Sequence, residues 1–366
     1  MSLRKNISYV LFPLTIWYAV GVRFRNMLYA VGIKKQEAPH VTTIGVGNLS
    51  TGGTGKTPHV EYLLRLLSDQ YATAMLSRGY KRKSKGYQID DGSHDYVRLG
   101  DEPAMIARKF PKVQVAVCEN RVEGVRQLMS GSRNEESGEQ IAAPQLIVLD
   151  DVFQHRAIKP SLNILLTEYD KPFFRDHILP FGDLREFRKA RYQANIVIVT
   201  KSPAVLNPID KHNFIQDLRL LTIQKVFFSY LSYGDLQPLN GDSPRPLKTV
   251  KSALVVTGIA HPEPMVAEIK RHCSVEHLRY ADHHQYTVRD IVRIKNAFDA
   301  LPNNNKAIIT TEKDAIRLAN MCEGLPVYTL PVTVSFHKDG DNTFDSVVES
   351  AVRENISFLS KLSIWS

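Results

Sequence analysis

The chain has 366 residues, of which 43% are hydrophobic and 23% charged, and this composition excludes wholesale disorder. This length favours two domains over one, although a single domain with insertions would also fit. The formal net charge of +9 predicts an anionic partner, which could be a nucleic acid, a phospholipid surface or a phosphorylated substrate. The three cysteines are far apart in sequence, which argues against a disulfide framework or a zinc cluster and fits a reducing cytosol.

The first 36 residues combine an apolar run with flanking cations and contain neither Asp nor Glu. The run at 9–22 has 14 residues, fewer than the roughly 20 that an untilted helix needs to cross a bilayer. No small-residue cleavage site follows it, as a signal peptide would require. Aromatic residues and cations favour a helix in the interface of an anionic membrane, and the alternative is a helix packed on the protein's own core. We therefore expect 1–36 to be a membrane-associating helical segment, peripheral or anchoring.

From residue 41 to residue 201, apolar β-branched runs alternate with segments of helical period. Continuous hydrophobicity is typical of strands covered on both faces, as in a parallel sheet flanked by helices. Such runs occur at 41–46, 71–77, 113–117, 145–151, 162–167 and 195–201. The predicted fold class is therefore α/β, with a mostly parallel sheet flanked by helices and a second, smaller α/β domain.

The boundary between the two predicted domains lies near residue 228. Residues 226–247 contain three prolines and two glycines, which predicts an extended linker with turns. A second alternation follows, with strands at 253–259, 275–280 and 306–311 and helices at 264–272 and 288–301. We predict a first domain at 37–228, a smaller domain at 229–335, and a helix at about 341–366 that packs back on the first domain. The polar residues 130–143 are predicted to be a surface insertion.

Residues 50–57 read STGGTGKT and carry most of a phosphate-binding loop. Ser50 stands where the strict pattern G-x-x-x-x-G-K-[ST] has its first glycine, so the start of the loop must accept a residue with a Cβ. A predicted strand precedes the loop, and a helical pattern with Pro58 near its first position follows it. The alternative is a structural turn. The order of strand, loop and helix makes the predicted sheet like that of P-loop NTPases. We assign nucleotide binding to Ser50, Thr51, Gly52, Gly53, Thr54, Gly55, Lys56 and Thr57.

Each polar group of this loop has an expected task. Backbone N–H groups would point at phosphate oxygens, and the positive end of the following helix would assist them. Lys56 would bridge the β- and γ-phosphates, and Thr57 would ligate Mg²⁺. Further along, the apolar run that ends in Asp150 and Asp151 is where an NTPase of this fold holds Mg²⁺, directly or through water. Two adjacent acids could also form a solvated turn, but the glycine loop favours the metal role.

Six further stretches occur in a specific order around these motifs. They are LSRGYKRKSKG (76–86), GDEPAMIA (100–107), ENR (119–121), ILPFGDLREF (178–187), ADHHQY (281–286) and TTEKDAIRL (310–318). In order and spacing the chain resembles the lipid A 4′-kinases, also called tetraacyldisaccharide 4′-kinases, from the amino-terminal apolar stretch to about residue 320. Val152 departs from that family, which usually has glycine after the two aspartates.

The resemblance implies a reaction and its cofactors, ATP and Mg²⁺. It makes 37–228 a P-loop kinase domain, and the smaller domain at 229–335 is expected to close over its active site. The γ-phosphate would pass to the 4′-hydroxyl of a membrane-bound tetraacyldisaccharide 1-phosphate at the cytoplasmic face of the inner membrane, giving the lipid A precursor lipid IVA. The expected partners are therefore this acylated lipid and an anionic membrane surface, with no nucleic acid. The oligomeric state stays open, and a monomer is plausible.

The resemblance also implies roles for individual residues. Asp101 matches the general base and His283 the histidine paired with it, with Lys56 as a third catalytic residue. Asp150 and Asp151 match the metal-site pair, and Arg121 and Glu186 match positions near the phosphates and metal. Glu186 is assigned to the metal, together with Thr57 of the glycine loop. Arg121 is assigned to the nucleotide, and Arg78 and Asn48 are assigned to the substrate.

Several of these residues have plainer interpretations from the sequence alone. Asp101 could be an N-cap, because aspartate is a favoured cap residue. His283 and His284 lack the spaced partners of a zinc site and could be surface or packing residues. A basic cluster is by default a solvated loop; beside a phosphate site it would contact the acceptor's 1-phosphate or lipid headgroups. Its members are Arg78, Lys81, Arg82, Lys83 and Lys85.

Two rival functions use the same glycine loop. A GTPase usually carries [NT]-K-x-D after a late strand, and here Thr200 and Lys201 are followed by Pro203 at the aspartate position. Guanine recognition is therefore unsupported. A nucleic-acid-stimulated NTPase would use the basic cluster, but no recognition module accompanies that cluster.

Overall fold

The computed structural model describes residues 2–133, 140–239, 243–302, 304–318, 321–322, 324–338 and 343–363. The chain divides into two compact units: unit 1 comprises Met1–Leu231 and Val334–Ser366, and unit 2 comprises Ser232–Thr333. The centre of the predicted surface insertion, 134–139, lies outside the described residues, and beside it β5 (Ser132–Arg133) pairs antiparallel with β6 (Gln140–Ile141).

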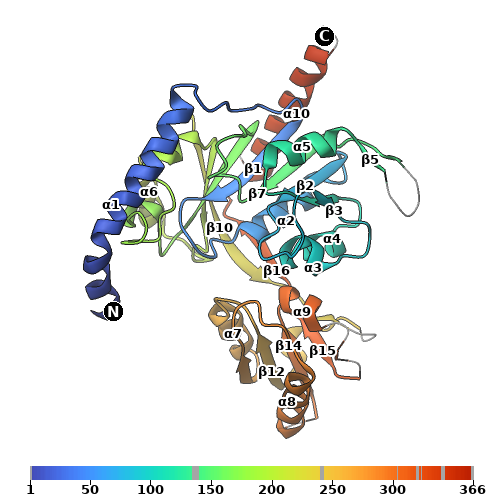
Figure 1. Ribbon diagram of the computed structural model, residues 1–366. Helices are drawn as coiled ribbons and strands as arrows, with labels where there is room; N and C mark the ends of the chain where they lie inside the picture. The colour runs from blue at the N-terminus through green and yellow to red at the C-terminus, as the bar shows by residue number, and fades with distance from the viewer. Residues whose placement is uncertain are drawn as a thin grey trace. The chain divides into compact units, whose positions relative to one another are not determined.

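Unit 1 is built on a nine-stranded sheet with the order β16-β10-β9-β8-β1-β7-β2-β4-β3 (Figure 1). The pairs from β10 to β4 are parallel, and the short β3 runs antiparallel to β4 at one edge. The strands are β1 (Thr42–Asn48), β2 (Thr73–Ser77), β3 (Gln88–Ile89), β4 (Gln114–Val117), β7 (Leu146–Asp150), β8 (Leu162–Glu168), β9 (Ile196–Thr200), β10 (Lys225–Tyr233) and β16 (Val332–Phe336). Every residue of β1, β2, β7 and β9 is buried, as the continuous hydrophobic runs predict.

Helices cover both faces of this sheet. Neighbouring residues of one strand contact different helices, because successive side chains of a strand point to opposite faces. On one face Met75 and Val148 pack with residues of α2 (Lys56–Leu67), α4 (Asp101–Lys109) and α10 (Phe344–Ser363). On the other face Leu76 and Leu149 pack with α5 (Arg121–Met129), and Val197 packs with α6 (Pro208–Leu218). The predicted α/β class with a mostly parallel, helix-flanked sheet is confirmed.

The amino-terminal apolar run lies inside a longer helix, α1 (Ser2–Ala30), which belongs to unit 1 (Figure 1). Leu14, Trp17 and Phe24 are exposed, whereas Thr15 and Val22 are buried. Within the part of the chain that the structure describes, no helix has both the length and the hydropathy of a membrane span.

Unit 2 contains a five-stranded sheet with the order β11-β15-β14-β12-β13, parallel except for β11. Its strands are β11 (Gln237–Pro238), β12 (Ser252–Thr257), β13 (Ser274–Arg279), β14 (Lys306–Thr310) and β15 (Val327–Thr329), and its helices are α7 (Glu263–Lys270), α8 (Val288–Ala300) and α9 (Glu312–Leu318). Residues of α7 pack on Val255 of β12, while residues of α8 pack on its neighbour Val256, which faces the other side.

The predicted extended linker at 226–247 is wrong for its first part. Residues Lys225–Tyr233 form β10, and Phe227 and Phe228 are buried on opposite faces of the first sheet. The glycines and prolines that suggested a linker all lie from Gly234 onward, so they do not interrupt the strand. Short helices that the periodicity did not predict are α3 (Tyr96–Leu99) and the 3₁₀ helices Phe173–Arg175, Arg188–Gln193 and Leu247–Thr249.

Candidate active site

The glycine loop joins the end of β1 to the start of α2. Its left-handed residues are Gly52 (φ +112°) and Gly55 (φ +84°), where a side chain would be strained. Ser50 is not among the residues with positive φ, and it pairs with Leu184 in an isolated antiparallel bridge. The serine at the first position is therefore compatible with the loop, because glycine is needed further along.

The carbonyl groups of the loop are held from behind by side chains. The Thr200 hydroxyl donates to the Thr54 carbonyl at 2.9 Å, and His59 Nδ1 lies 2.7 Å from the Gly55 carbonyl oxygen. Since a carbonyl only accepts, Nδ1 carries the proton, and Nε2 accepts from the Ser229 hydroxyl at 2.9 Å. In a trans peptide C=O and N–H point in opposite directions. Since the Thr54 and Gly55 carbonyls point towards these side chains, the N–H groups of Gly55 and Lys56 point in the opposite direction, where they can bind an anion.

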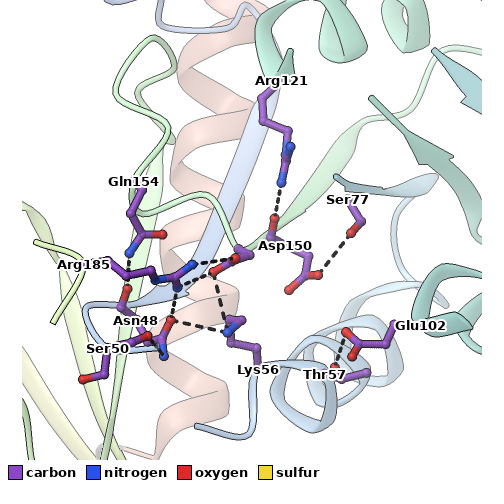
Figure 2. Close-up of polar contacts among 11 residues, drawn as sticks. Asn48, Ser50, Lys56, Thr57, Ser77, Glu102, Arg121, Asp150, Gln154 and Arg185 are labelled. Atoms are coloured by element: carbon purple, nitrogen blue, oxygen red, sulfur yellow. Dashed lines mark hydrogen bonds and ion pairs between the residues drawn. The ribbon is translucent and has the colours of Figure 1, made fainter. Parts of the chain in front are cut away.

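Lys56 begins α2 and lies beside polar groups from three other segments (Figure 2). Its Nζ is 3.6 Å from Asp151 Oδ1 and 3.4 Å from Asn48 Oδ1. Arg185 donates to both Asp151 oxygens, at 3.0 and 3.2 Å, and to Asn48 Oδ1 at 2.6 Å. Asn48 is fully buried and donates to the Ser50 carbonyl. The structure thus brings together the predicted Lys56, Asn48 and Asp151.

Arg185 was missed by the sequence analysis. Its only signal was its place in the ILPFGDLREF stretch, beside Glu186. Burial works against the charged form of Asp151, but Lys56 and Arg185 outweigh it and lower the pKa of that carboxyl. Asp151 therefore stays ionised between two cations.

Asp150 has a different environment at the end of β7. It is 6% exposed, its Oδ2 accepts from the Ser77 hydroxyl at 3.3 Å, and its Oδ1 has no hydrogen-bond partner within the described structure. Burial, followed by the charges of Glu102 and Asp151, raises the pKa of Asp150 to about 7. A buried carboxyl whose pKa is raised in this way is typical of a functional site, and a bound cation would stabilise its ionised form.

The predicted nucleotide residue Arg121 is also buried beside Asp150. Its guanidinium donates to the backbone carbonyls of Asp150 and Cys118, both at 3.0 Å, rather than to the carboxylate. Burial lowers its pKa, although the charges of Asp150 and Asp151 oppose this shift. Arg121 thus braces the backbone beside the metal-site candidates.

Val152, the departure from the family pattern, fits its surroundings. The left-handed residue of this turn is Asp151 (φ +47°), not Val152. Val152 is 4% exposed, and its Cγ1 would lie only 2.7 Å from a Cβ on Gly45. The valine therefore packs over a glycine of β1, and the backbone there needs no glycine after the aspartates.

Thr57 and the GDEP stretch meet at the start of two helices. The Thr57 hydroxyl donates to Glu102 Oε2 at 3.0 Å, and Glu102 is a second residue that the sequence analysis left unassigned. Asp101 is 8% exposed and is the first residue of α4. The N-cap of that helix is Gly100, so the interpretation of Asp101 as a plain N-cap is not supported.

The remaining predicted residues of unit 1 have other surroundings. Arg78 is exposed on the loop after β2. Within the basic cluster, Arg82 is not a solvated residue: its side chain is 2% exposed, pairs with Glu119 at 2.6 Å and donates to the Gly86 carbonyl. The Glu186 carboxylate contacts Arg25 and Asn26 of α1. Its predicted role at the metal stays a prediction.

His283 lies in unit 2, in the turn after β13, with φ +62°. The backbone N–H of His283 donates to the Gly258 carbonyl at 3.0 Å, and the ring Nε2 is 3.4 Å from Lys313 Nζ. Its neighbour His284 is a packing residue, stacked on Tyr280 and 3.1 Å from Asp290 Oδ2. The pairing of His283 with Asp101 stays a prediction.

A glycine loop between a buried parallel strand and a helix, with two aspartates ending the neighbouring strand, defines a nucleoside-triphosphate-binding protein of the P-loop class. Similarity to known proteins identifies the family within this class. The sequence profile described as LpxK, tetraacyldisaccharide-1-P 4′-kinase, matches residues 7–353, and the chain belongs to this family.

Similar proteins cover nearly the whole chain. The tetraacyldisaccharide 4′-kinase of Flavobacterium johnsoniae is 41% identical over 349 residues, covering 95% of this chain and 98% of that protein. The protein of the same name from Phocaeicola vulgatus is 40% identical over 362 residues, 96% of each chain. Among solved structures, the "apo" form of LpxK from Aquifex aeolicus in complex with ATP has a TM-score of 0.73 at 27% identity, covering 96% of this chain and 99% of that one. The family assignment therefore applies to both units.

Proposed function

We propose that this chain is an ATP-dependent kinase that transfers the γ-phosphate to the 4′-hydroxyl of a tetraacyldisaccharide 1-phosphate, producing the lipid A precursor lipid IVA. The observation that carries the proposal is the anchored glycine loop with Lys56 beside Asn48 and Asp151. Family membership supplies the acceptor, because the names of the relatives state it.

The loop and its neighbours suit the donor substrate. The N–H groups of Gly55 and Lys56 would bind the phosphates of ATP, and the Lys56 side chain would leave its weak contacts to neutralise the terminal phosphates. Charge stabilisation of this kind usually supplies most of the rate in phosphoryl transfer. Arg121 would act through the backbone beside Asp150.

The residues present also fit Mg²⁺. Asp150 and Asp151 supply carboxylate oxygens and Thr57 supplies a hydroxyl, and Asp150 Oδ1 is buried without a hydrogen-bond partner in the described structure. No cluster of three or more His, Cys, Asp or Glu suited to a metal occurs among the described residues. Mg²⁺ does not need one, since it typically uses one or two carboxylates together with substrate phosphates and waters. When bound, the ion would neutralise charge on the phosphates.

Two further roles follow from the family resemblance. Asp101, buried at the start of α4, would orient the acceptor hydroxyl and take its proton, with His283 as its partner. Arg78, exposed on its loop, would bind the acceptor's 1-phosphate.

We also propose that α1 places the enzyme on the cytoplasmic face of the inner membrane. Trp17 is 76% exposed, and Leu14 and Phe24 are each 56% exposed. A helix of this kind, without acidic residues, is suited to bind an anionic lipid surface.

The test is a transfer assay with labelled ATP, Mg²⁺ and the lipid disaccharide, followed by location of the new phosphate. We expect phosphate at the 4′ position, and we expect Lys56→Ala to lower turnover by about 1,000-fold because a transition-state charge loses its partner. Lys211→Ala, on the surface helix α6, is the control. Turnover stimulated by DNA and not by the lipid, or an unimpaired Lys56→Ala variant, would refute the proposal.

A further inference from the structure

The segment that carries Arg185 runs beside the phosphate loop. The Thr51 N–H donates to the Asp183 carbonyl and the Arg185 N–H donates to the Leu49 carbonyl, both at 2.7 Å. Ser50 and Leu184 lie between these bonds as an isolated antiparallel bridge. The position of residues 183–185 is therefore coupled to the start of the loop through the backbone.

Arg185 is the side chain that this segment directs into the site. Its guanidinium bridges Asp151 and Asn48, the two groups that also contact Lys56 (Figure 2). A guanidinium presents its donors in a rigid planar fork, so the position of the Arg185 backbone affects how well the side chain reaches both oxygens. Contacts on the other side of this backbone therefore bear on the site.

The helix α1 supplies these contacts. The Tyr18 hydroxyl donates to the Arg185 backbone carbonyl at 3.1 Å. The next residue, Glu186, is 1% exposed, and its carboxylate forms an ion pair with Arg25 and accepts from Asn26 Nδ2 at 3.1 Å. A buried carboxylate that loses its cationic partner is strongly destabilised. Arg25 and Asn26 therefore fix Glu186, and through it the backbone of Arg185.

We propose that α1 is a positioning element of the active site: Tyr18, Arg25 and Asn26 hold Arg185 against Asp151 and Asn48. These three residues contact the segment at 185–186, while Trp17 and Phe24 remain exposed on the same helix. The inference rests on the proposed kinase function for its activity readout, and it has a second readout that does not.

The first experiment compares Arg25→Ala with Arg23→Ala. Each removes one cation from α1, but Arg23 is exposed and Arg25 pairs with Glu186. With the lipid acceptor in detergent micelles, we expect Arg25→Ala to lower kcat/KM for ATP about tenfold and Arg25→Lys to recover part of it. The two alanine variants should lose equal affinity for anionic vesicles. A tenfold loss in both, or in neither, would overturn the proposal.

Amide hydrogen exchange separates this inference from the kinase proposal. We expect Arg25→Ala, but not Arg23→Ala, to speed exchange at residues 49–51 and 183–186 in the absence of any substrate, about tenfold. Tyr18→Phe removes one hydrogen bond and should give a smaller increase at the same amides if Arg25→Ala folds poorly. Unchanged exchange in these variants would refute the positioning role even if the parent is an active kinase. If exchange is faster in the Arg25→Ala variant but the parent has no transferase activity, only the kinase function is refuted.

Discussion

Two buried aspartates, one in each unit, have opposite environments. In unit 2, Asp314 is fully buried and both of its carboxylate oxygens accept hydrogen bonds. Oδ2 accepts from the Gly258 N–H at 3.0 Å and the Thr311 hydroxyl at 2.7 Å, and Oδ1 accepts from Arg317 at 2.8 Å. In unit 1, Asp150 Oδ1 has no hydrogen-bond partner within the described structure, and burial raises the pKa of the carboxyl to about 7.

The hydrogen bonding of these two carboxylates distinguishes a structural residue, Asp314, from a candidate functional residue, Asp150. Arg317 also donates to the His284 carbonyl at 2.7 Å, so the Asp314 network fixes the turn that carries His283. A satisfied buried network of this kind rigidifies its surroundings. Asp150 instead has a buried oxygen without a hydrogen-bond partner in the described structure, which costs stability and is typical of a functional site.

The largest effect is expected from breaking the satisfied network. Asp314→Ala leaves the Arg317 cation buried without its carboxylate, and we expect the free energy of unfolding to fall by about 3–5 kcal/mol. Urea unfolding followed by fluorescence measures this change. Asp69→Ala, which breaks the exposed ion pair with Lys112, is the control and should have no measurable effect. Equal stability of the Asp314 variant and the parent would contradict the comparison.

An intermediate effect of opposite sign is expected at Asp150. Asp150→Asn removes a charge that the fold disfavours, so at pH 8 without Mg²⁺ the free energy of unfolding should rise by about 1–2 kcal/mol. Turnover should fall by about 100-fold or more because the proposed metal ligand is lost. The measurements are urea unfolding in EDTA and the transfer assay. A variant that loses stability as Asp314→Ala does would place Asp150 in the structural class.

The smallest effect is expected at His59, which supports the loop from behind. Burial lowers its pKa to about 4, although the Gly55 carbonyl opposes the shift, so the folded state keeps it neutral. In the unfolded chain the same histidine takes up a proton near pH 6.5. A neutral, buried His59 therefore leaves the free energy of unfolding at its full value above pH 6.5, and this free energy falls as the pH decreases from 6.5 towards 4. We expect His59→Leu to reduce that pH dependence, because His155, whose pKa burial also lowers to about 4, keeps its own contribution. We also expect it to weaken ATP binding by about 5–30-fold, the equivalent of one to two hydrogen bonds.

Unfolding at pH 5 and 7 and ATP titration of His59→Leu test this prediction. The matched control is His212→Leu, an exposed histidine of α6, which should change neither quantity. If the His59 variant kept the parental ATP affinity, the orientation of the Gly55 carbonyl would not matter for the phosphate loop.

Local sequence patterns determined the elements and the central motif. Hydrophobic runs predicted β1, β2, β4, β7, β8 and β9, since a strand buried on both faces must be apolar along its whole length. The glycine loop was readable because Gly52 and Gly55 meet a backbone requirement within their own few residues. The error at β10 arose where a strand directly precedes a segment rich in glycine and proline.

Tertiary structure alone decided which polar groups meet. Arg185 reaches Asn48 across 137 positions, Thr57 reaches Glu102 across 45, and Thr200 reaches Thr54 across 146. Hydrophobic periodicity does not predict contacts between residues so far apart in sequence, because these contacts depend on the order of strands in the sheet and on the path of the loop at 183–186. Periodicity reports whether a side chain faces the core, but a polar side chain inside the core acquires its role from whichever partner the fold places beside it.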